Sequence, residues 1–209
     1  PRPNRLLIDA ALAGLAPGRQ GLPDFYFVGF GAYANEAVFR REVTQVRDIV
    51  GNRFDTAARS MLLVNSRRTM DELPLANRSN LDYLLRALGQ RMEPDADILF
   101  LFLTSHGRED GRLVVDFGEL GLNDLEPREL RRILDETRIK WRVLVVSACF
   151  SGAFLPALES PQTLVITAAA SDRSSFGCAH ENTWTYFGEA FFRDALAAQP
   201  NRVDAFKAA

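Results

Sequence analysis

The sequence predicts an α/β fold in which helices cover both faces of a mostly parallel β-sheet. Apolar segments of strand length alternate along the chain with segments of helical period, as repeated βαβ units require. Most of the strand candidates are apolar on consecutive residues, which is typical of strands covered on both faces. With 209 residues, the chain is long enough for one well-buried core and short for two, so we expect a single domain.

Five apolar segments are the predicted strands. They are "FYFVGF" (25–30), "SMLLVN" (60–65), "DILFLFLT" (97–104), "WRVLVVSA" (141–148) and "TLVITAA" (163–169). No internal repeat, low-complexity tract or linker interrupts this alternation. We therefore expect one domain over residues 1–209, with an N-terminal extension (1–22) ahead of the core (23–198).

Apolar stripes of helical period lie between the strands. The first stripe recurs at spacings of four and three and predicts a helix with one buried face; it consists of Phe39, Val43, Val46 and Val50. A second helix is predicted within "SNLDYLLRALGQRM", where Ser79 and Asp82 match a capping box and Pro94 lies just past the end. Its buried stripe is Leu81, Leu84, Leu85, Leu88 and Met92.

Two further helices complete the alternation. Pro127 suits the first turn of a helix, whose buried stripe is Leu130, Ile133, Leu134 and Thr137. The last helix is predicted from about Trp184 to Ala198, and the residues expected to face inward are Phe187, Ala190 and Phe191.

The composition is that of an ordinary soluble globular protein, with 47% hydrophobic residues, 25% charged residues and a formal net charge of -2. The arginine pairs at 40–41, 67–68 and 131–132 lie among acidic residues. We interpret them as solvated helix faces and do not expect nucleic-acid binding. No apolar run reaches the roughly 18 residues of a transmembrane span, and residues 1–20 lack a signal-peptide core. We therefore expect no membrane contact from this segment.

The two ends of the chain bear on whether it belongs to a longer protein. It begins abruptly on Pro1 and stops within a helical pattern at "FKAA", as a segment cut from a longer protein would. A membrane anchor outside these residues therefore stays possible. The compartment stays open as well, between the cytoplasm and a periplasmic or tethered location, and nothing in the sequence indicates the oligomeric state.

Two strand ends carry residues suited to catalysis. Sheets of this kind bind ligands at the carboxyl ends of their parallel strands. The segment "FLFLTSHGRED" places His106 and Gly107 just beyond one strand, and "VLVVSACFSG" places Cys149 just beyond the next. Because neighbouring strands lie about 4.8 Å apart, the thiol and the imidazole can come within hydrogen-bond reach.

The chemistry of the two residue types supports this pairing. An isolated thiol has a pKa of about 8.5, and an adjacent imidazole can take its proton. The backbone N–H groups of Gly107 and Cys149 can form an oxyanion hole. Taken alone, a cysteine after a strand is usually a small core residue, and a loop histidine is usually just polar. Finding both at consecutive strand ends, each near a glycine, favours a nucleophile beside its base.

These residues also carry a resemblance. "FLFLTSHG" and "RVLVVSACFSG" resemble the His-Gly and Ala-Cys signatures of the legumain family of caspase-fold cysteine peptidases. "TAAASDRSSFGCAHENTWTYFGEAF" is similar to the family's segment after the catalytic strand, in which Thr-Ala-Ala leads to Ser-Ser-aromatic, cysteine and Thr-Tyr-aromatic-Gly-acid. "LNDLEPREL" sits where the family has its Asp-Leu helix entry. The resemblance covers the chain from about Phe25 to Phe192.

The resemblance implies a caspase-like three-layer α/β/α sandwich and an endopeptidase that works on peptide or protein substrates without a metal or cofactor. Cys149 matches the family's nucleophile and His106 its general base, with a thioester acyl-enzyme as the intermediate. Some members pass the acyl group to an amine, so a peptide ligase or transamidase on the same dyad stays open. A catalytically silent interaction module is a further alternative, which the intact dyad disfavours.

The specificity pocket departs from the family pattern. Two residues before the nucleophile the family has a glutamate, whereas this chain has Ser147, which puts asparagine specificity in doubt. Ser174 and Ser175 match the family's pocket serines, and Glu189 falls at its pocket-floor aspartate. An acid with hydroxyls accepts Asn, Arg or Lys at the cleaved position. Glu189 also fits an exposed acid at a helix start, and Asn35, the nearest match to a family asparagine, also fits a loop cap.

The remaining cysteine chemistry has simpler interpretations. Two cysteines are too few for a disulfide framework, so we expect free thiols. Cys178 matches a family cysteine without a chemical role, and we interpret it as packing. A zinc site formed by Cys149, Cys178, His106 and His180 is disfavoured because no Cys-x-x-Cys pair accompanies it. A serine hydrolase on Ser151 is disfavoured because "ACFSGA" lacks the first glycine of a nucleophile elbow.

Overall fold

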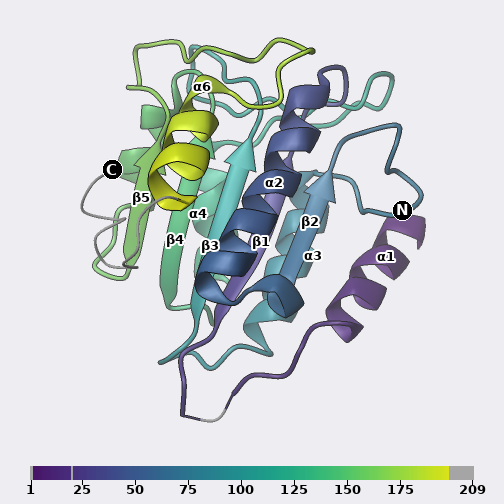
Figure 1. Cartoon of the computed structure of the whole chain (residues 1–209), viewed down its shortest axis with the longest axis vertical. Helices are drawn as coiled ribbons and strands as arrows, with labels where there is room; N and C mark the ends of the chain where they lie inside the picture. The colour runs from purple at the N-terminus through teal and green to yellow at the C-terminus, as the bar shows by residue number, and fades with distance from the viewer. Residues whose placement is uncertain (1, 20, 198–209) are drawn as a thin grey trace.

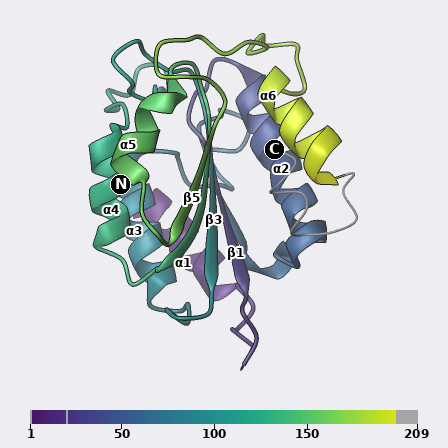
Figure 2. The same ribbon diagram turned by 90° about the vertical axis from the view of Figure 1, so that its left-hand side faces the viewer.

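The structure, a computed structural model, describes residues 2–19 and 21–197. Its centre is a five-stranded, all-parallel β-sheet of order β2-β1-β3-β4-β5, with helices packed on both faces (Figures 1 and 2). The predicted three-layer α/β/α sandwich is therefore confirmed.

The five predicted strands are confirmed, and each differs from its prediction by no more than two residues at either end. They are β1 (Phe25–Gly31), β2 (Ser60–Val64), β3 (Ile98–Thr104), β4 (Trp141–Ser147) and β5 (Thr163–Thr167). The near-complete burial of β1, β3 and β4 explains why their sequences lack polar alternation. The loops after the strands gather at one edge of the sheet, which is the top edge in Figure 1.

The two faces of the sheet carry separate hydrophobic clusters. One face is covered by α1 (Arg2–Ala13), α3 (Arg78–Gly89), α4 (Pro127–Asp135) and α5 (Leu155–Leu158) (Figure 2). The other face is covered by α2 (Ala37–Phe54), α6 (Tyr186–Gly188) and the π-helix η3 (Glu189–Leu196). Two short 3₁₀ turns, η1 (Ala57–Arg59) and η2 (Ser151–Phe154), complete the described elements.

The predicted stripes of α2 and α4 are largely confirmed. The apolar stripe of α2 is buried against the sheet. Pro127 occupies the first turn of α4, and Leu130, Ile133 and Leu134 are buried. Thr137 instead lies past the end of α4, where its hydroxyl donates to the Leu134 carbonyl at 2.7 Å.

The start of α3 corrects the predicted cap. Asn77, not Ser79, is the N-cap, and its side chain accepts a hydrogen bond from the Asn80 N–H at 2.9 Å. Asparagine is as good an N-cap as serine, and starting earlier adds helical hydrogen bonds. The helix also ends at Gly89, so Met92 is buried in the turn that follows rather than on the helix.

The C-terminal helix differs from its predicted period. It begins at Tyr186 and continues as the π-helix η3, in which Phe191 and Phe192 are buried and Ala190 is exposed. Phe187, also predicted to face inward, packs half-buried against the same cluster. A π-helix bonds residue i to i+5, which changes the positions that face inward relative to the predicted α-period. The predicted end at Ala198 lies outside the described residues.

The first residues of the chain also pack on the core. Helix α1 lies within the expected N-terminal extension, against α3, and its Ile8 and Leu12 join the cluster on that face. Within residues 2–19 and 21–197, no helix is both long and apolar enough to cross a membrane.

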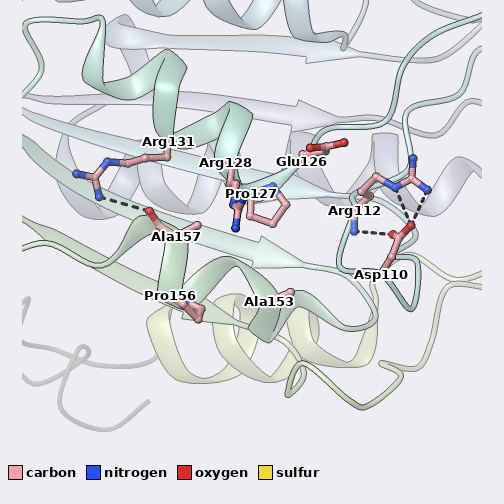
Figure 3. A pocket seen from close by; sticks show the side chains of 9 residues that line it. All are labelled: Asp110, Arg112, Glu126, Pro127, Arg128, Arg131, Ala153, Pro156 and Ala157. Atoms are coloured by element: carbon pink, nitrogen blue, oxygen red, sulfur yellow. Dashed lines mark hydrogen bonds and ion pairs between the residues drawn. The ribbon is translucent and has the colours of Figure 1, made fainter.

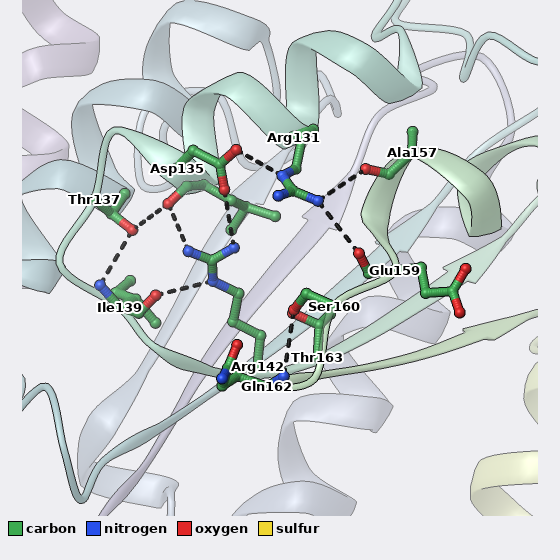
Figure 4. Close-up of polar contacts among 11 residues, drawn as sticks. Arg131, Asp135, Thr137, Ile139, Arg142, Ala157, Glu159, Ser160, Gln162 and Thr163 are labelled. Carbon is green, nitrogen blue, oxygen red and sulfur yellow. Dashed lines mark hydrogen bonds and ion pairs between the residues drawn. The ribbon is translucent and has the colours of Figure 1, made fainter.

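A polar network fixes the end of α4 (Figure 4). Arg142 donates to the carbonyl oxygens of Leu134 at 2.8 Å and Ile139 at 2.9 Å. Arg131 pairs with Asp135 at 2.6 Å and reaches the carbonyl oxygens of Ala157 and Glu159. Because the last carbonyls of a helix lack partners within it, these arginines stabilise the connection from α4 into the sheet.

We predict that Arg142→Met lowers the free energy of unfolding by about 1–3 kcal/mol, because it leaves the Ile139 carbonyl without its side-chain donor and removes one of the donors to the Leu134 carbonyl. Urea denaturation measures this loss. Arg138→Met is the matched control, since the Arg138 side chain is exposed and has no partner among the described residues. Equal losses in the two variants would contradict the role given to Arg142.

Candidate active site

The register of β3 and β4 brings His106 and Cys149 to one edge of the sheet. The two strands are parallel neighbours, and their last residues, Thr104 and Ser147, are paired. His106 and Cys149 each follow two residues after those ends. The predicted adjacency of the two strand ends is therefore present.

Gly107 makes the closest contact between the two loops. A Cβ atom at this position would lie 1.8 Å from the Cys149 carbonyl oxygen, so only glycine fits. Neither the Gly107 N–H nor the Cys149 N–H has an acceptor within residues 2–19 and 21–197. Two backbone donors thus stay available beside the thiol, as an oxyanion hole requires.

The residue after Cys149 has an unusual backbone. Phe150 adopts the left-handed conformation with φ 55° and ψ 17°, which is uncommon for a residue other than glycine. Its N–H is held by the Arg173 carbonyl at 2.8 Å. Such conformations cost about 1–3 kcal/mol and persist only where the surroundings impose them. Here the sharp turn from β4 into η2 leaves Cys149 at its apex.

The His106 ring is held by aromatic side chains and an acid. The rings of Tyr33 and Phe39 meet it edge-on, with centroids at 4.6 Å and 5.1 Å. Glu36 Oε2 lies 3.1 Å from His106 Nε2 and makes no hydrogen bond to another described group. Because the Glu36 carboxylate contacts Nε2, Nδ1 is the ring nitrogen that can exchange a proton with a thiol.

The Cys149 thiol faces the loop that follows β5. Its Sγ accepts from the Ser175 N–H at 3.2 Å and lies 3.4 Å from the Ser175 carbonyl oxygen. Among the described residues, no hydrogen bond joins this Sγ to the His106 ring. Contacts of this kind are often long in a ligand-free enzyme and tighten when substrate binds.

The second cysteine differs from the first. Burial, followed by the nearby Cys149 and the acids Glu42 and Glu36, raises the pKa of the Cys178 thiol to about 12. Cys178 therefore stays protonated at neutral pH, which fits the packing role that the sequence predicts. In the described part of the chain, no three His, Cys, Asp or Glu side chains are grouped so as to hold a metal ion.

The residues predicted for substrate binding fall in different environments. Ser147 is buried, with its hydroxyl 3.2 Å from that of Thr185. Ser174 is exposed, whereas Ser175 is half-buried against the thiol. Glu189 forms an ion pair with Arg193, one turn further along η3.

Asn35 is exposed, and its amide donates to the Asp116 carboxylate at 3.0 Å. The structure thus brings the next residue, Glu36, onto the His106 ring and not Asn35. Nothing in the sequence distinguishes Glu36 from any other acid before a helix start. Only the placement of the β1–α2 turn over the end of β3 reveals it.

Sequence reasoning also missed Glu42, a fully buried acid on α2. Its Oε1 accepts from the Thr185 N–H at 3.1 Å and from the Thr185 hydroxyl at 2.6 Å, and its Oε2 accepts from the Thr104 hydroxyl. A Cβ at Gly188 would lie 2.0 Å from Oε1, so glycine is needed there. The signal in the sequence was the position of Glu42 four residues after Val38, which places it on the buried face of α2.

A separate hollow of about 730 Å³ lies between α4 and the segment after Cys149 (Figure 3). Three of its charged groups are paired, since Arg112 bonds Asp110 and Arg131 bonds the Ala157 carbonyl. Gly111, with φ +83°, lets this loop approach Ala153 closely. The hollow therefore borders the loops of both His106 and Cys149 on the α4 face of the sheet.

The part of the chain that carries these loops matches a known protein family. A sequence profile of the peptidase C13 family matches residues 86–205, which is more than half of the 209 residues. The match begins in the last turns of α3 and includes β3, β4, β5 and the loops that follow them. No curated protein sequence matches the chain.

We predict that Glu42→Gln stabilises the fold increasingly as the pH is raised. Burial raises the pKa of Glu42 above its ordinary value of 4.5. Below that value both states hold the proton. Above it, the unfolded chain releases the proton more readily than the folded one, so wild-type stability falls with rising pH until the folded-state pKa is passed. The amide of E42Q lacks this titration.

Urea denaturation from about pH 4 to about pH 8 measures the difference between wild type and variant at each pH. Glu159→Gln is the matched control, because the Glu159 side chain is exposed. A difference that stays constant with pH would show that burial of a charge at Glu42 does not limit stability.

Proposed function

Since the chain belongs to the peptidase C13 family, the legumain-type cysteine peptidases, we propose that it is an endopeptidase in which Cys149 is the nucleophile and His106 the general base. The observation that carries this proposal is the convergence of the two residues at paired strand ends, with two unpaired backbone N–H groups beside them. Membership of a peptidase family implies peptide or protein substrates.

The proposed reaction follows from these groups. His106 takes the Cys149 proton, and the thiolate attacks the scissile carbonyl carbon to form a C–S bond. The negative charge passes to the carbonyl oxygen, where the N–H groups of Gly107 and Cys149 stabilise it. The C–N bond then breaks as His106 returns the proton to the leaving amine. A water molecule, deprotonated by His106, hydrolyses the thioester and regenerates the thiol.

In this mechanism Glu36 is a positioning residue. Its carboxylate lies on His106 Nε2, so it fixes the ring orientation and stabilises the positive charge that forms when the ring takes the thiol proton. The aromatic contacts of Tyr33 and Phe39 hold the same ring in place.

We predict that Cys149→Ala and His106→Ala each lower kcat by at least about a thousandfold, because each removes a group that acts in the chemical step. Cleavage of a peptide library, read by mass spectrometry, measures activity and shows which residue the site accepts before the cleaved bond. Cys178→Ala should retain activity and is the matched control. Cleavage that persists in Cys149→Ala would rule out the assigned nucleophile.

We predict that Glu36→Gln lowers kcat about 10–100-fold and leaves KM nearly unchanged, because the amide keeps the shape of the side chain but no longer stabilises the positive charge that His106 gains in the chemical step. Thermal unfolding of the same variant checks that the fold is intact. A change confined to KM, or a loss of activity that matches a loss of thermal stability, would show that Glu36 does not act through the base.

A further inference from the structure

A second pocket, of about 270 Å³, lies at the carboxyl ends of β1 and β2. Two of the three arginine pairs in the sequence meet there: Arg40 and Arg41 from α2, and Arg67 and Arg68 from the loop after β2. Glu36 is the acidic residue in its lining. The interpretation of these two pairs as solvated helix faces is corrected in part: Arg67 and Arg68 are exposed but lie in a loop, and the pairing of β2 with β1 brings the two pairs together around one cavity.

Most of these guanidinium groups lack a partner. Arg41 donates to the carbonyl oxygens of His180 and Asn182. The guanidinium groups of Arg40, Arg67 and Arg68 form no hydrogen bond or ion pair with any described residue. Arginines elsewhere in the fold, such as those of the α4 network, bond to carboxylates or carbonyls.

The unpaired charges also repel one another. Burial, and then the positive charges of Arg68 and Arg41, lower the pKa of Arg40. Arginine nevertheless stays protonated at neutral pH. Arg40 and Arg41 are half-buried, whereas Arg67 and Arg68 are exposed. Like charges around a cavity gain from an anion that enters it, and planar guanidinium groups match carboxylates in two-point hydrogen bonds.

The pocket borders the candidate active site. Glu36 lines it and also holds the His106 ring. On the other side, His180 Nδ1 accepts from the Ala37 N–H at 3.3 Å. His180 belongs to the same loop as Ser175, which contacts the Cys149 thiol. A peptide that follows this loop away from Cys149 therefore reaches the pocket.

We propose that this pocket binds acidic side chains of the substrate on the N-terminal side of the scissile bond, so that the enzyme selects peptides with Asp or Glu there. This proposal rests on the proposed function and names its substrate class. The N-terminal side follows from the resemblance that assigns Ser174 and Ser175 to the residue before the cleaved bond. The cavity has room for side chains rather than for a folded partner, and the overall charge of -2 disfavours a polyanion.

The test is a set of fluorogenic peptides that share one cleavage site and differ only in the position of a single Glu, or of Gln as its neutral match. Wild type should cleave the best Glu peptide with a kcat/KM about tenfold or more above its Gln match, mainly through KM. The ratio should fall towards one in the double variant Arg67→Gln/Arg68→Gln and in Arg40→Gln. High salt should reduce it in the wild type.

Arg138→Gln is the control, because this exposed arginine lies at the opposite edge of the sheet, before β4, and should keep the wild-type ratio. The proposal is overturned if wild type cleaves the neutral peptides but shows no Glu preference, or shows it only on the C-terminal side of the bond. It is also overturned if inorganic phosphate accelerates cleavage of the neutral peptides through these arginines, which would indicate a regulatory anion site. Failure to cleave any peptide would instead reject the proposed function.

Discussion

The register between β3 and β4 is the constraint on which the candidate site depends. Because the strands are parallel and paired to their last residues, equal steps beyond each end bring His106 and Cys149 to the same edge. Gly107 then allows the loops after β3 and β4 to pack closely, since any side chain there would collide with the Cys149 carbonyl. A slip of one residue in this register would move the neighbouring side chains to the opposite face of the sheet. The fully buried apolar residues of both strands oppose such a slip.

A buried acid ties the rest of the site to this pair of strands. Glu42 reaches from α2 to Thr104 at the end of β3 and to Thr185 before α6, whose hydroxyl lies beside Ser147 at the end of β4. Burying a carboxyl is unfavourable unless hydrogen bonds compensate it, and here three donors do so. Through Thr185, a buried acid of α2 is thus linked to Ser147, two residues before Cys149.

The sequence predicted what depends on local pattern and on strand ends. Unbroken apolar runs predicted the five strands, and the residues that follow them predicted His106, Gly107 and Cys149. Glu36 and Glu42 were missed because their roles depend on where α2 lies relative to β3, which no local pattern encodes. The arginine pairs at 40–41 and 67–68 were misinterpreted for the same reason, since only the sheet order brings them together. Of the inward residues predicted for the last helix, Phe187 and Phe191 do pack on the core, whereas Ala190 is exposed because a π-helix changes the period.

The sheet order also places the proposed catalytic residues and the basic pocket at the ends of different strands. The proposed nucleophile and base follow β4 and β3, whereas the basic pocket follows β1 and β2, on the other side of the His106 loop. Glu36 is the residue common to both, because it begins α2 at the border of the pocket and touches the imidazole. Loops after β1 and β2 can therefore vary in charge without moving the strand ends that carry the dyad. In the proposed enzyme, an acidic substrate side chain among the arginines would lie near the Glu36 carboxylate, which would couple substrate selection to the orientation of the base.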